Sequence, residues 1–487
     1  MRMQQRSRSR EHQEAAATRK APSTAGASTA TLGMTVVEMA PEAGAVDKAA
    51  PMAAIAGTAV QSARKPPELP PELHEDAARQ RQRREAAFML RLIAFRQHVE
   101  VLREGAGKTA KTVSWKLTIR PPQLVLEVLG SMEKLTRSLL WRNTVVSFVD
   151  AHGINEGGVD EGGLTAQMHS SFWRQALHPN AGLFELGDAD DGTKVLPCAR
   201  ADSAHLARLQ MVGRVLCKSV LDDHPIGESL GSLAFDFLVD QHEQRALGCV
   251  DDALRSLADF KSGLAATWRS YLALADDELE SYGLNRSNFD EQDDGDDVAL
   301  THETLPAAVL AGCRWQLLGC RREALVALRR GFVEFVDLSL QLAPLDTSEL
   351  MLMVQGRVDI SAEELIGWFA WPDASPAAAN AAGFVDVTHA AAASNVLRAL
   401  FRDDAAIPAA RRLKLLQFCT GLCALPLGGL RTPITLQWDS RLPQDGRLPV
   451  AHTCVPQMDC PCYSSHEAAV SAFEKALAAN TDGFALE

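Results

Sequence analysis

The sequence contains no uninterrupted apolar run of about 18 residues, the length that a membrane-spanning helix requires. Positive charge is in deficit, because 49 Lys and Arg residues face 62 Asp and Glu residues and the formal net charge is −13. Phosphate groups repel an acidic surface, so neither nucleic acid nor an anionic membrane is expected as the main partner. The first ten residues are basic and polar without an apolar core, which does not fit a secretory signal.

The remaining composition is typical of a globular protein that keeps its cysteines reduced. Apolar residues make up 46% of the chain and charged residues 23%. Without secretion, the ten cysteines are expected to be free thiols. A chain of 487 residues is long enough for about two to four domains. We therefore expect a multidomain protein of the cytoplasm or the nucleus.

Two segments precede the main body of the chain. Residues 1–75 are rich in Ala, Ser, Thr, Pro and Gly without a helical or strand period, so we predict that they are disordered. Residues 76–113 are predicted to be a helical lead-in, in which basic side chains flank an apolar stripe. Packing of this helix on the following domain is favoured over binding to calmodulin or to a membrane surface. The stripe consists of Phe88, Leu90, Leu92, Ile93, Phe95 and Val99.

The pattern over residues 114–384 predicts a mainly helical domain with a few strands. A short apolar strand is followed by the glycine-rich loop 153–163, whose two Gly-Gly pairs imply positive φ angles or close backbone approach. Asp160 and Glu161 lie between these pairs. A metal site is one interpretation, but we favour an acidic turn that caps a helix starting near Leu164.

The final domain is predicted over residues 389–487. Its expected order is two helices, two short strands and a last helix. Gly421 is expected to end the second helix, since glycine is common just past a helix C-terminus. The predicted elements are Ser394–Phe401, Ala409–Cys419, Ile434–Trp438, Val450–Cys454 and a helix after Ser464 that buries Val470, Phe473 and Leu477.

Cys454 is the candidate reactive thiol. It lies between Pro449 and Pro456 in a segment too irregular to be buried core, whereas most of the other cysteines have apolar helical or strand-like surroundings. In an extended segment His452 shares a face with Cys454, with Cβ atoms roughly 6–7 Å apart. That spacing is long for a direct hydrogen bond, so a thiol-protease ion pair is not favoured. An exposed thiol that accepts an acyl group and passes it on fits better.

A zinc site is an alternative use of the same domain. Its spacings are poor, because one cysteine pair lies on a predicted helix and the other is tighter than the usual chelating pair. A zinc-binding interaction module therefore stays open as a less favoured interpretation. The candidate ligands are Cys419, Cys423, His452, Cys454, Cys460, Cys462 and His466.

The motifs around Cys454 resemble a known family. The segment 448–454, together with Asp459, Pro461, Tyr463-Ser464-Ser465 and the ending 483–487, is similar to the C-terminal lobe of HECT-type E3 ubiquitin ligases. Several upstream motifs follow in the family's order, and the resemblance covers residues 114–487. They are Val159-Asp160-Glu161-Gly162-Gly163-Leu164, Asn180 to Phe184, Gly213-Arg214-Val215-Leu216, Thr420-Gly421 and Leu425-Pro426-Leu427-Gly428-Gly429.

The resemblance implies an α+β enzyme of two lobes without a cofactor or a catalytic metal. A mostly helical N-lobe, residues 114–384, would recruit a ubiquitin-charged E2, and a small α/β C-lobe, residues 389–487, would carry the cysteine. Ubiquitin would pass from the E2 thiol to Cys454 and then to a substrate lysine. The small residues of 383–393 suit the flexible hinge that such a transfer requires.

The resemblance also assigns roles to single residues. Cys454 would be the nucleophile that carries the glycyl thioester, and His452 and Thr453 would shape its loop. Asp459 would orient the thioester or help to take a proton from the attacking lysine. Phe484 would dock the tail on the N-lobe, and Glu487 with the terminal carboxylate would assist lysine attack. The alternative is a catalytically degenerate scaffold of the same fold that binds ubiquitin or E2 without turnover.

Overall fold

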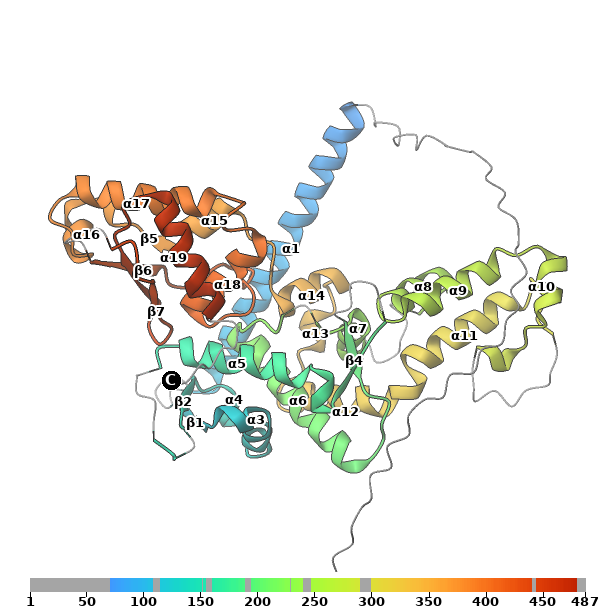
Figure 1. Ribbon diagram of the computed structural model, residues 1–487. Helices are drawn as coiled ribbons and strands as arrows, with labels where there is room; N and C mark the ends of the chain where they lie inside the picture. Colours follow the sequence, from blue (N-terminus) through green and yellow to red (C-terminus); the bar gives the residue numbers. More distant parts are fainter. Residues whose placement is uncertain are drawn as a thin grey trace, which may run out of the picture. The chain divides into compact units, whose positions relative to one another are not determined.

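A computed structural model of the protein (Figure 1) describes residues 71–107, 114–150, 152–154, 160–188, 194–227, 229–239, 247–289, 299–439 and 444–479. Most of the segment predicted to be disordered lies outside these ranges, as do Phe484 and Glu487. Residues 71–75, which were included in that segment, instead begin the first helix. No helix in the described ranges is both long enough and apolar enough to cross a membrane.

Helix α1 (Pro71–Gly105) packs against the domain that follows it, as the sequence predicted. Four apolar side chains at helical spacing are buried, namely Phe88, Leu92, Phe95 and Val99. The predicted stripe was wrong at Leu90 and Ile93, which are 68% and 47% exposed on the other side of the helix. Two ion pairs add to the contact, from Arg96 to Asp223 at 2.9 Å and from Arg103 to Asp222 at 3.2 Å.

The first lobe is mainly helical with two small sheets. Strands β1 and β2 pair in parallel, and the crossover that a parallel pair requires is supplied by α3 and α4. Strands β3 and β4 form an antiparallel pair. The elements are β1 (Trp115–Ile119), α3 (Leu124–Glu133), α4 (Arg137–Leu140), β2 (Thr144–Phe148), α5 (Gly163–Ala176), β3 (Phe184–Leu186), β4 (Val195–Pro197) and α6 (Ser203–Asp222).

The lobe continues with further helices, and the closest helix pair is α6 with α12. Gly213 on α6 lies against the Leu328 carbonyl, and Gly331 on α12 lies against the Gln210 carbonyl. A Cβ atom at either glycine would overlap the partner backbone, so both glycines permit the close approach. The helices are α7 (Ser232–Val239), α8 (Val250–Ala258), α9 (Ser262–Leu272), α10 (Asp276–Tyr282), α11 (Leu305–Leu317), α12 (Arg322–Val333), α13 (Ser339–Leu342) and α14 (Thr347–Gln355).

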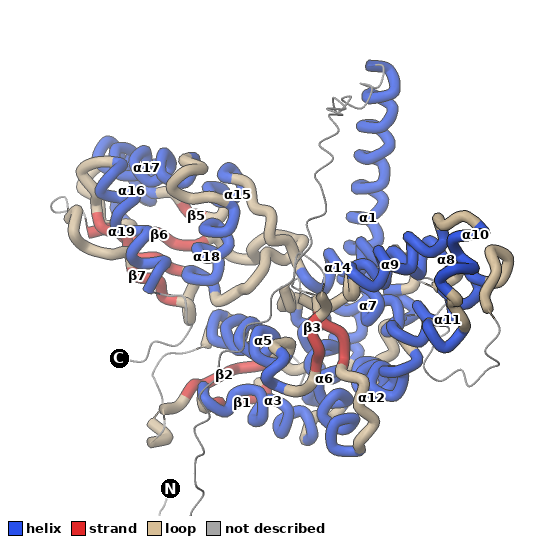
Figure 2. The backbone as a smooth tube through the Cα atoms, turned by 45° about the vertical axis from the view of Figure 1, so that its right-hand side comes forward, coloured by secondary structure: helices blue, strands red, loops and turns tan. Residues whose placement is uncertain are grey.

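The second lobe is a four-stranded mixed sheet packed with helices, drawn as red strands among blue helices in Figure 2. The strand order is β5-β6-β8-β7; β5, β6 and β8 run parallel, and β7 is an antiparallel edge strand. The elements are α15 (Ala362–Gly367), β5 (Phe369–Ala370), α16 (Pro376–Ala381), α17 (Val387–Arg402), α18 (Ala409–Thr420), β6 (Ile434–Asp439), β7 (Val450–His452), β8 (Gln457–Pro461) and α19 (His466–Ala479). This arrangement confirms the predicted α+β fold of two lobes.

The two lobes have separate apolar cores. The first core ends at Val354 and the second begins at Ile360, so the predicted boundary at 384–389 lies within the second core. The predicted hinge at 383–393 was wrong, because most of it belongs to α17. Alanine favours helix more than any other residue, and the Asp386 side chain caps the helix by accepting the His389 N–H at 2.9 Å.

Phe473 on α19 provides a test of the second core. The ring is fully buried and contacts Phe401 and Tyr463 edge-on. We expect Phe473→Ala to lower the free energy of unfolding of this lobe by about 3–5 kcal/mol, because the change leaves a cavity. Urea unfolding followed by tryptophan fluorescence measures this loss. Val385→Ala, at a side chain 83% exposed, is the matched control, and an equal loss in both variants would contradict the assigned core.

Candidate functional site

The candidate site lies at the tip of a hairpin formed by β7 and β8. The two strands pair with Val450 opposite Asp459 and His452 opposite Gln457. The Val455 N–H donates to the His452 carbonyl at 3.1 Å, which closes a four-residue turn. Cys454 is therefore in a turn, and the prediction that its strand extends through residue 454 was wrong by two residues.

A hydrogen-bonded network stands beside the turn. His452 Nε2 and Asp459 Oδ2 are 2.8 Å apart, and Gln457 Nε2 donates to Asp459 Oδ1 at 2.7 Å. Partial burial opposes ionisation of Asp459, but the bonds from His452 and Gln457 outweigh it and hold the pKa of the carboxyl below its usual value. The carboxylate is thus charged at neutral pH and fixed from both sides.

The β7–β8 hairpin contains four of the predicted site residues, His452, Thr453, Cys454 and Asp459, and adds Gln457. The His452 side chain contacts Asp459 across the hairpin through a hydrogen bond, which is also an ion pair when the imidazole is protonated. Gln457 was missed, because strand β8 was not predicted. Its alternation with Asp459 along an apolar segment is the signal that would have placed both side chains on one face.

The other cysteines are mostly unsuited to nucleophilic chemistry. Cys217, Cys313, Cys419 and Cys460 are buried, whereas Cys454 is half-buried. Burial raises the pKa of the Cys217 and Cys313 thiols to about 12, and it raises the pKa of Cys419 and Cys460 as well. A thiol that remains protonated is a poor nucleophile. These cysteines therefore serve as small apolar core residues.

The candidate zinc ligands do not assemble. Among the residues that the structure describes, no group of three or more His, Cys, Asp or Glu side chains is placed to hold a metal ion. Cys419 is in the core, where its sulfur lies 4.0 Å from that of Met458, and Cys423 donates to the Pro225 carbonyl at 3.3 Å. The described part of the chain therefore contains no zinc site of the kind that this interpretation requires.

The acidic loop before α5 is the structural turn that the sequence favoured. The Asp160 carboxylate accepts the N–H groups of Gly162 at 2.8 Å and Leu164 at 3.1 Å, so it caps the helix. Gly162 has a φ of 117°, which confirms the expected left-handed backbone at this pair. Both carboxylate oxygens of Asp160 accept hydrogen bonds from backbone N–H groups, which argues against Asp160 as a metal ligand.

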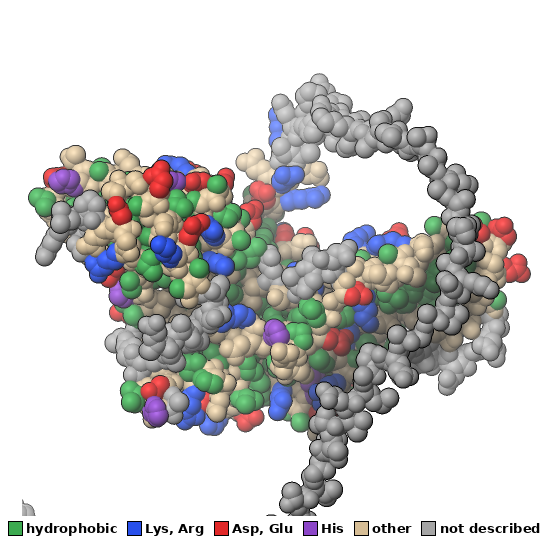
Figure 3. Space-filling view, viewed as in Figure 1, with side chains coloured by type: hydrophobic (Ala, Val, Ile, Leu, Met, Phe, Trp, Pro, Cys, Tyr) green, Lys and Arg blue, Asp and Glu red, His purple; other side chains and the backbone are tan. Residues whose placement is uncertain are grey.

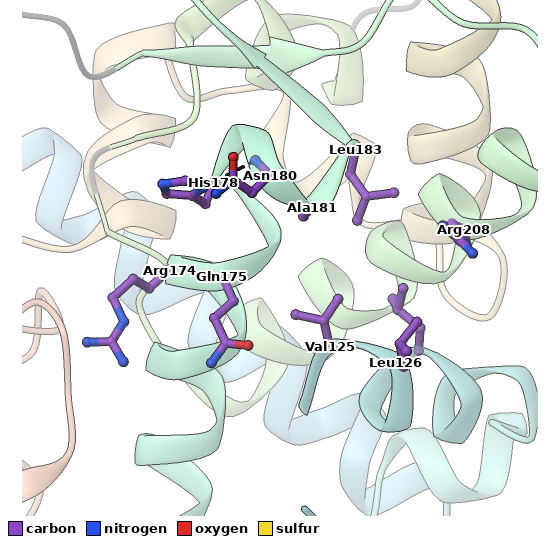
Figure 4. Close-up of a pocket in the computed structure, with 10 residues that line it drawn as sticks. Val125, Leu126, Arg174, Gln175, His178, Asn180, Ala181, Leu183 and Arg208 are labelled. Carbon is purple, nitrogen blue, oxygen red and sulfur yellow. Dashed lines mark hydrogen bonds between the residues drawn. The ribbon is translucent and has the colours of Figure 1, made fainter. Parts of the chain in front are cut away.

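A pocket of about 700 Å³ lies elsewhere on the first lobe (Figure 4). Its lining combines apolar side chains with Arg174, Gln175, His178 and Arg208, and none of the predicted site residues lines it. On the face drawn in Figure 3, acidic and basic side chains are intermixed over both lobes. The pocket is therefore separate from the candidate site around Cys454.

Comparison with known proteins finds a matching family and several relatives. Residues 170–487 match the family described as HECT-domain (ubiquitin-transferase). The chain is 26% identical over 279 residues to a "Bifunctional serine/threonine-protein kinase/NEDD4-like E3 ubiquitin-protein ligase" of Dictyostelium discoideum, covering 57% of this chain and 13% of that protein. It is 23% identical over 355 residues to "E3 ubiquitin-protein ligase HUWE1" of Mus musculus, covering 68% and 7%.

A fungal relative gives the same result. The chain is 25% identical over 348 residues to "E3 ubiquitin-protein ligase TOM1-like" of Neurospora crassa, covering 68% of this chain and 8% of the relative. The chain thus spans only a small part of the length of the curated relatives it matches. The match confirms the resemblance that the motifs around Cys454 indicated.

Proposed function

This chain belongs to the HECT-domain (ubiquitin-transferase) family, and from that premise we propose that it is an E3 ubiquitin ligase with Cys454 as its acyl carrier. The observation that carries the proposal is the position of Cys454. It is half-buried in the turn of the hairpin that also carries the hydrogen-bonded Asp459 carboxylate, while the buried cysteines have raised pKa values. Partial exposure is what an acyl-accepting thiol requires.

The proposed reaction has two steps, and ubiquitin is the cargo in both. In the first, the Cys454 thiolate attacks the thioester carbonyl of ubiquitin on the E2, a new C–S bond forms, and the E2 thiolate leaves. The bond made and the bond broken are of one type, so this step depends on positioning more than on activation. In the second, a substrate lysine amine attacks, loses its proton, forms an amide bond and releases the Cys454 thiolate.

Further parts of the proposal rest on the family resemblance. The first lobe recruits the charged E2, the Asp459 carboxylate orients the thioester or the incoming lysine, and His452 and Thr453 shape the turn. Phe484 docks the tail on the first lobe, and Glu487 assists lysine attack; both lie outside the described residues. The partners are ubiquitin, an E2 and protein substrates, and the proposed compartment is the cytoplasm or the nucleus.

A non-reducing gel tests the proposal directly. The full chain is mixed with E1, a panel of E2 enzymes and labelled ubiquitin, and we expect an adduct of one ubiquitin that disappears on treatment with thiol reductant. Transfer of the label to lysine side chains should follow with time. If no E2 in the panel charges the chain, while a known ligase is charged in the same mixture, the chain is a catalytically degenerate scaffold of this fold.

A further inference from the structure

Helix α1 has an exposed face opposite the one that packs on the first lobe. The packed side begins at Phe88 and ends at Val99, and both side chains are buried. A helix turns by about 100° per residue, so Leu90 points away from both, and its side chain is 68% exposed. Figures 1 and 2 show the first half of α1 projecting beyond the other labelled helices. This face is therefore accessible to a partner.

The exposed face carries a heptad pattern. Eight residues follow one another at spacings that alternate between four and three, the repeat that keeps a stripe on one side of a paired helix. All eight side chains are exposed. The stripe begins with positive charge, ends with negative charge and is mainly apolar between them. We call it the α1 stripe, and it consists of Arg79, Arg83, Ala86, Leu90, Ile93, Gln97, Glu100 and Glu104.

The order of charges along the α1 stripe is complementary to a second copy of the same stripe. When two copies run antiparallel, Arg79 of each lies opposite Glu104 of the other. The same register places Arg83 opposite Glu100. A parallel pair would instead place arginine against arginine and glutamate against glutamate, which repel. The stripe therefore matches itself in the antiparallel direction only.

We propose that the α1 stripe is a dimerisation surface, on which two copies of the chain pair through antiparallel α1 helices about a two-fold axis. At the centre Leu90 of each copy packs against Ile93 of the other, which removes both side chains from water. Because Phe88 and Val99 face the first lobe, each lobe lies on the outer side of its own helix. The same patch is used by both copies, as a two-fold interface requires.

The two ends of the stripe favour a second copy over an anionic membrane. A membrane would attract Arg79 and Arg83 but would repel Glu100 and Glu104 on the same face. Glu100 is 61% exposed and lies 3.9 Å from Arg103 of its own helix, so its carboxylate can also reach an arginine across the interface. Exposed ion pairs are individually weak and are screened by salt. The dimer is therefore expected to be reversible and to weaken as salt rises.

Charge reversal at the arginines tests the pairing. The full chain has a mass of 52.7 kDa, and we expect sedimentation equilibrium to show a reversible dimer of twice this mass. Arg79→Glu/Arg83→Glu should raise the Kd of the dimer by about tenfold or more, because each facing pair turns from attractive to repulsive. Arg81→Glu/Arg84→Glu is the matched control. It makes the same change of charge at exposed positions of the same helix that lie off the stripe.

Mixing two variants separates lost pairing from damaged folding. Glu100→Arg/Glu104→Arg should weaken its own dimer as much as Arg79→Glu/Arg83→Glu does, since it too places like charges opposite each other. An equimolar mixture of the two variants should restore a dimer that contains one chain of each, because every facing pair is then attractive. A fluorescent label on one variant, followed by sedimentation velocity, measures this restored complex.

Other outcomes overturn the proposed dimer. They are a wild-type chain that stays monomeric at its highest soluble concentration, an equal loss in the off-stripe control, and a mixture that remains monomeric. If the wild-type chain is monomeric and Glu100→Arg/Glu104→Arg binds phosphatidylserine vesicles more tightly than it does, the stripe is a membrane-binding surface instead. None of these measurements involves charging by an E2, so the dimer and the proposed function stand or fall separately.

Discussion

Cys454→Ala is expected to abolish the reducible ubiquitin adduct completely, because the variant has no sulfur at the tip of the β7–β8 hairpin. Three half-buried cysteines elsewhere, Cys198, Cys320 and Cys423, are not expected to replace it, because burial is the largest cause of their raised pKa values. The measurement is the non-reducing gel with charged E2, read as the fraction of chain that carries labelled ubiquitin.

Cys454→Ser sharpens the same test. A serine hydroxyl at this position would form an oxygen ester, so any remaining adduct should resist thiol reductant and yield to hydroxide. Cys249→Ser is the control, because Cys249 is an exposed thiol in the first lobe and its replacement should leave the adduct at the wild-type level. If Cys454→Ala forms as much adduct as the wild type, another residue carries the acyl group and the proposed site is wrong.

Local features of the second lobe were predictable from the sequence. Helix α18 and strands β6 and β7 fall close to the predicted elements, the second half of α17 was predicted, and Gly421 ends α18 in the left-handed conformation that glycine adopts most readily. The identity of Cys454 as the thiol in an irregular segment also followed from its flanking prolines. Each of these inferences uses residues that are near neighbours in the chain.

The remaining parts depend on contacts between distant residues. Strand β8 joins β6 and β7 through pairs such as Trp438 with Cys460, which no local period reveals. The run of alanines before Ser394 was interpreted as a hinge, although its burial against the second core and its cap at Asp386 make it helix. The hydrogen bond from the Glu161 N–H to the Cys454 carbonyl joins segments almost 300 residues apart. Only the loop's paired glycines indicated that another backbone approaches there.

Asp459→Asn is expected to slow transfer from charged Cys454 to lysine by about tenfold to a hundredfold while charging from the E2 stays near the wild-type rate. The amide keeps the shape of the side chain but loses the negative charge that His452 and Gln457 hold in place. The measurement is a single-turnover chase, in which the chain is charged once from an E2, further charging is stopped, and the adduct is discharged with free lysine. Gln457→Ala, which removes one of the two bonds, should show a smaller loss of the same kind.

The pH dependence of this variant separates the two roles proposed for Asp459. The pKa of Asp459 in the folded protein is lowered below the usual 3.8. The side chain therefore carries its negative charge at neutral pH and loses it only when the pH falls below that value. A carboxylate with so low a pKa is a weak proton acceptor, which favours orienting the thioester and the lysine over general base catalysis. The ratio of wild-type to Asp459→Asn discharge should therefore be constant between about pH 6 and pH 8. A ratio that rises with pH across this range would instead indicate a group that titrates near neutrality. Asp459 would then be assigned the role of general base.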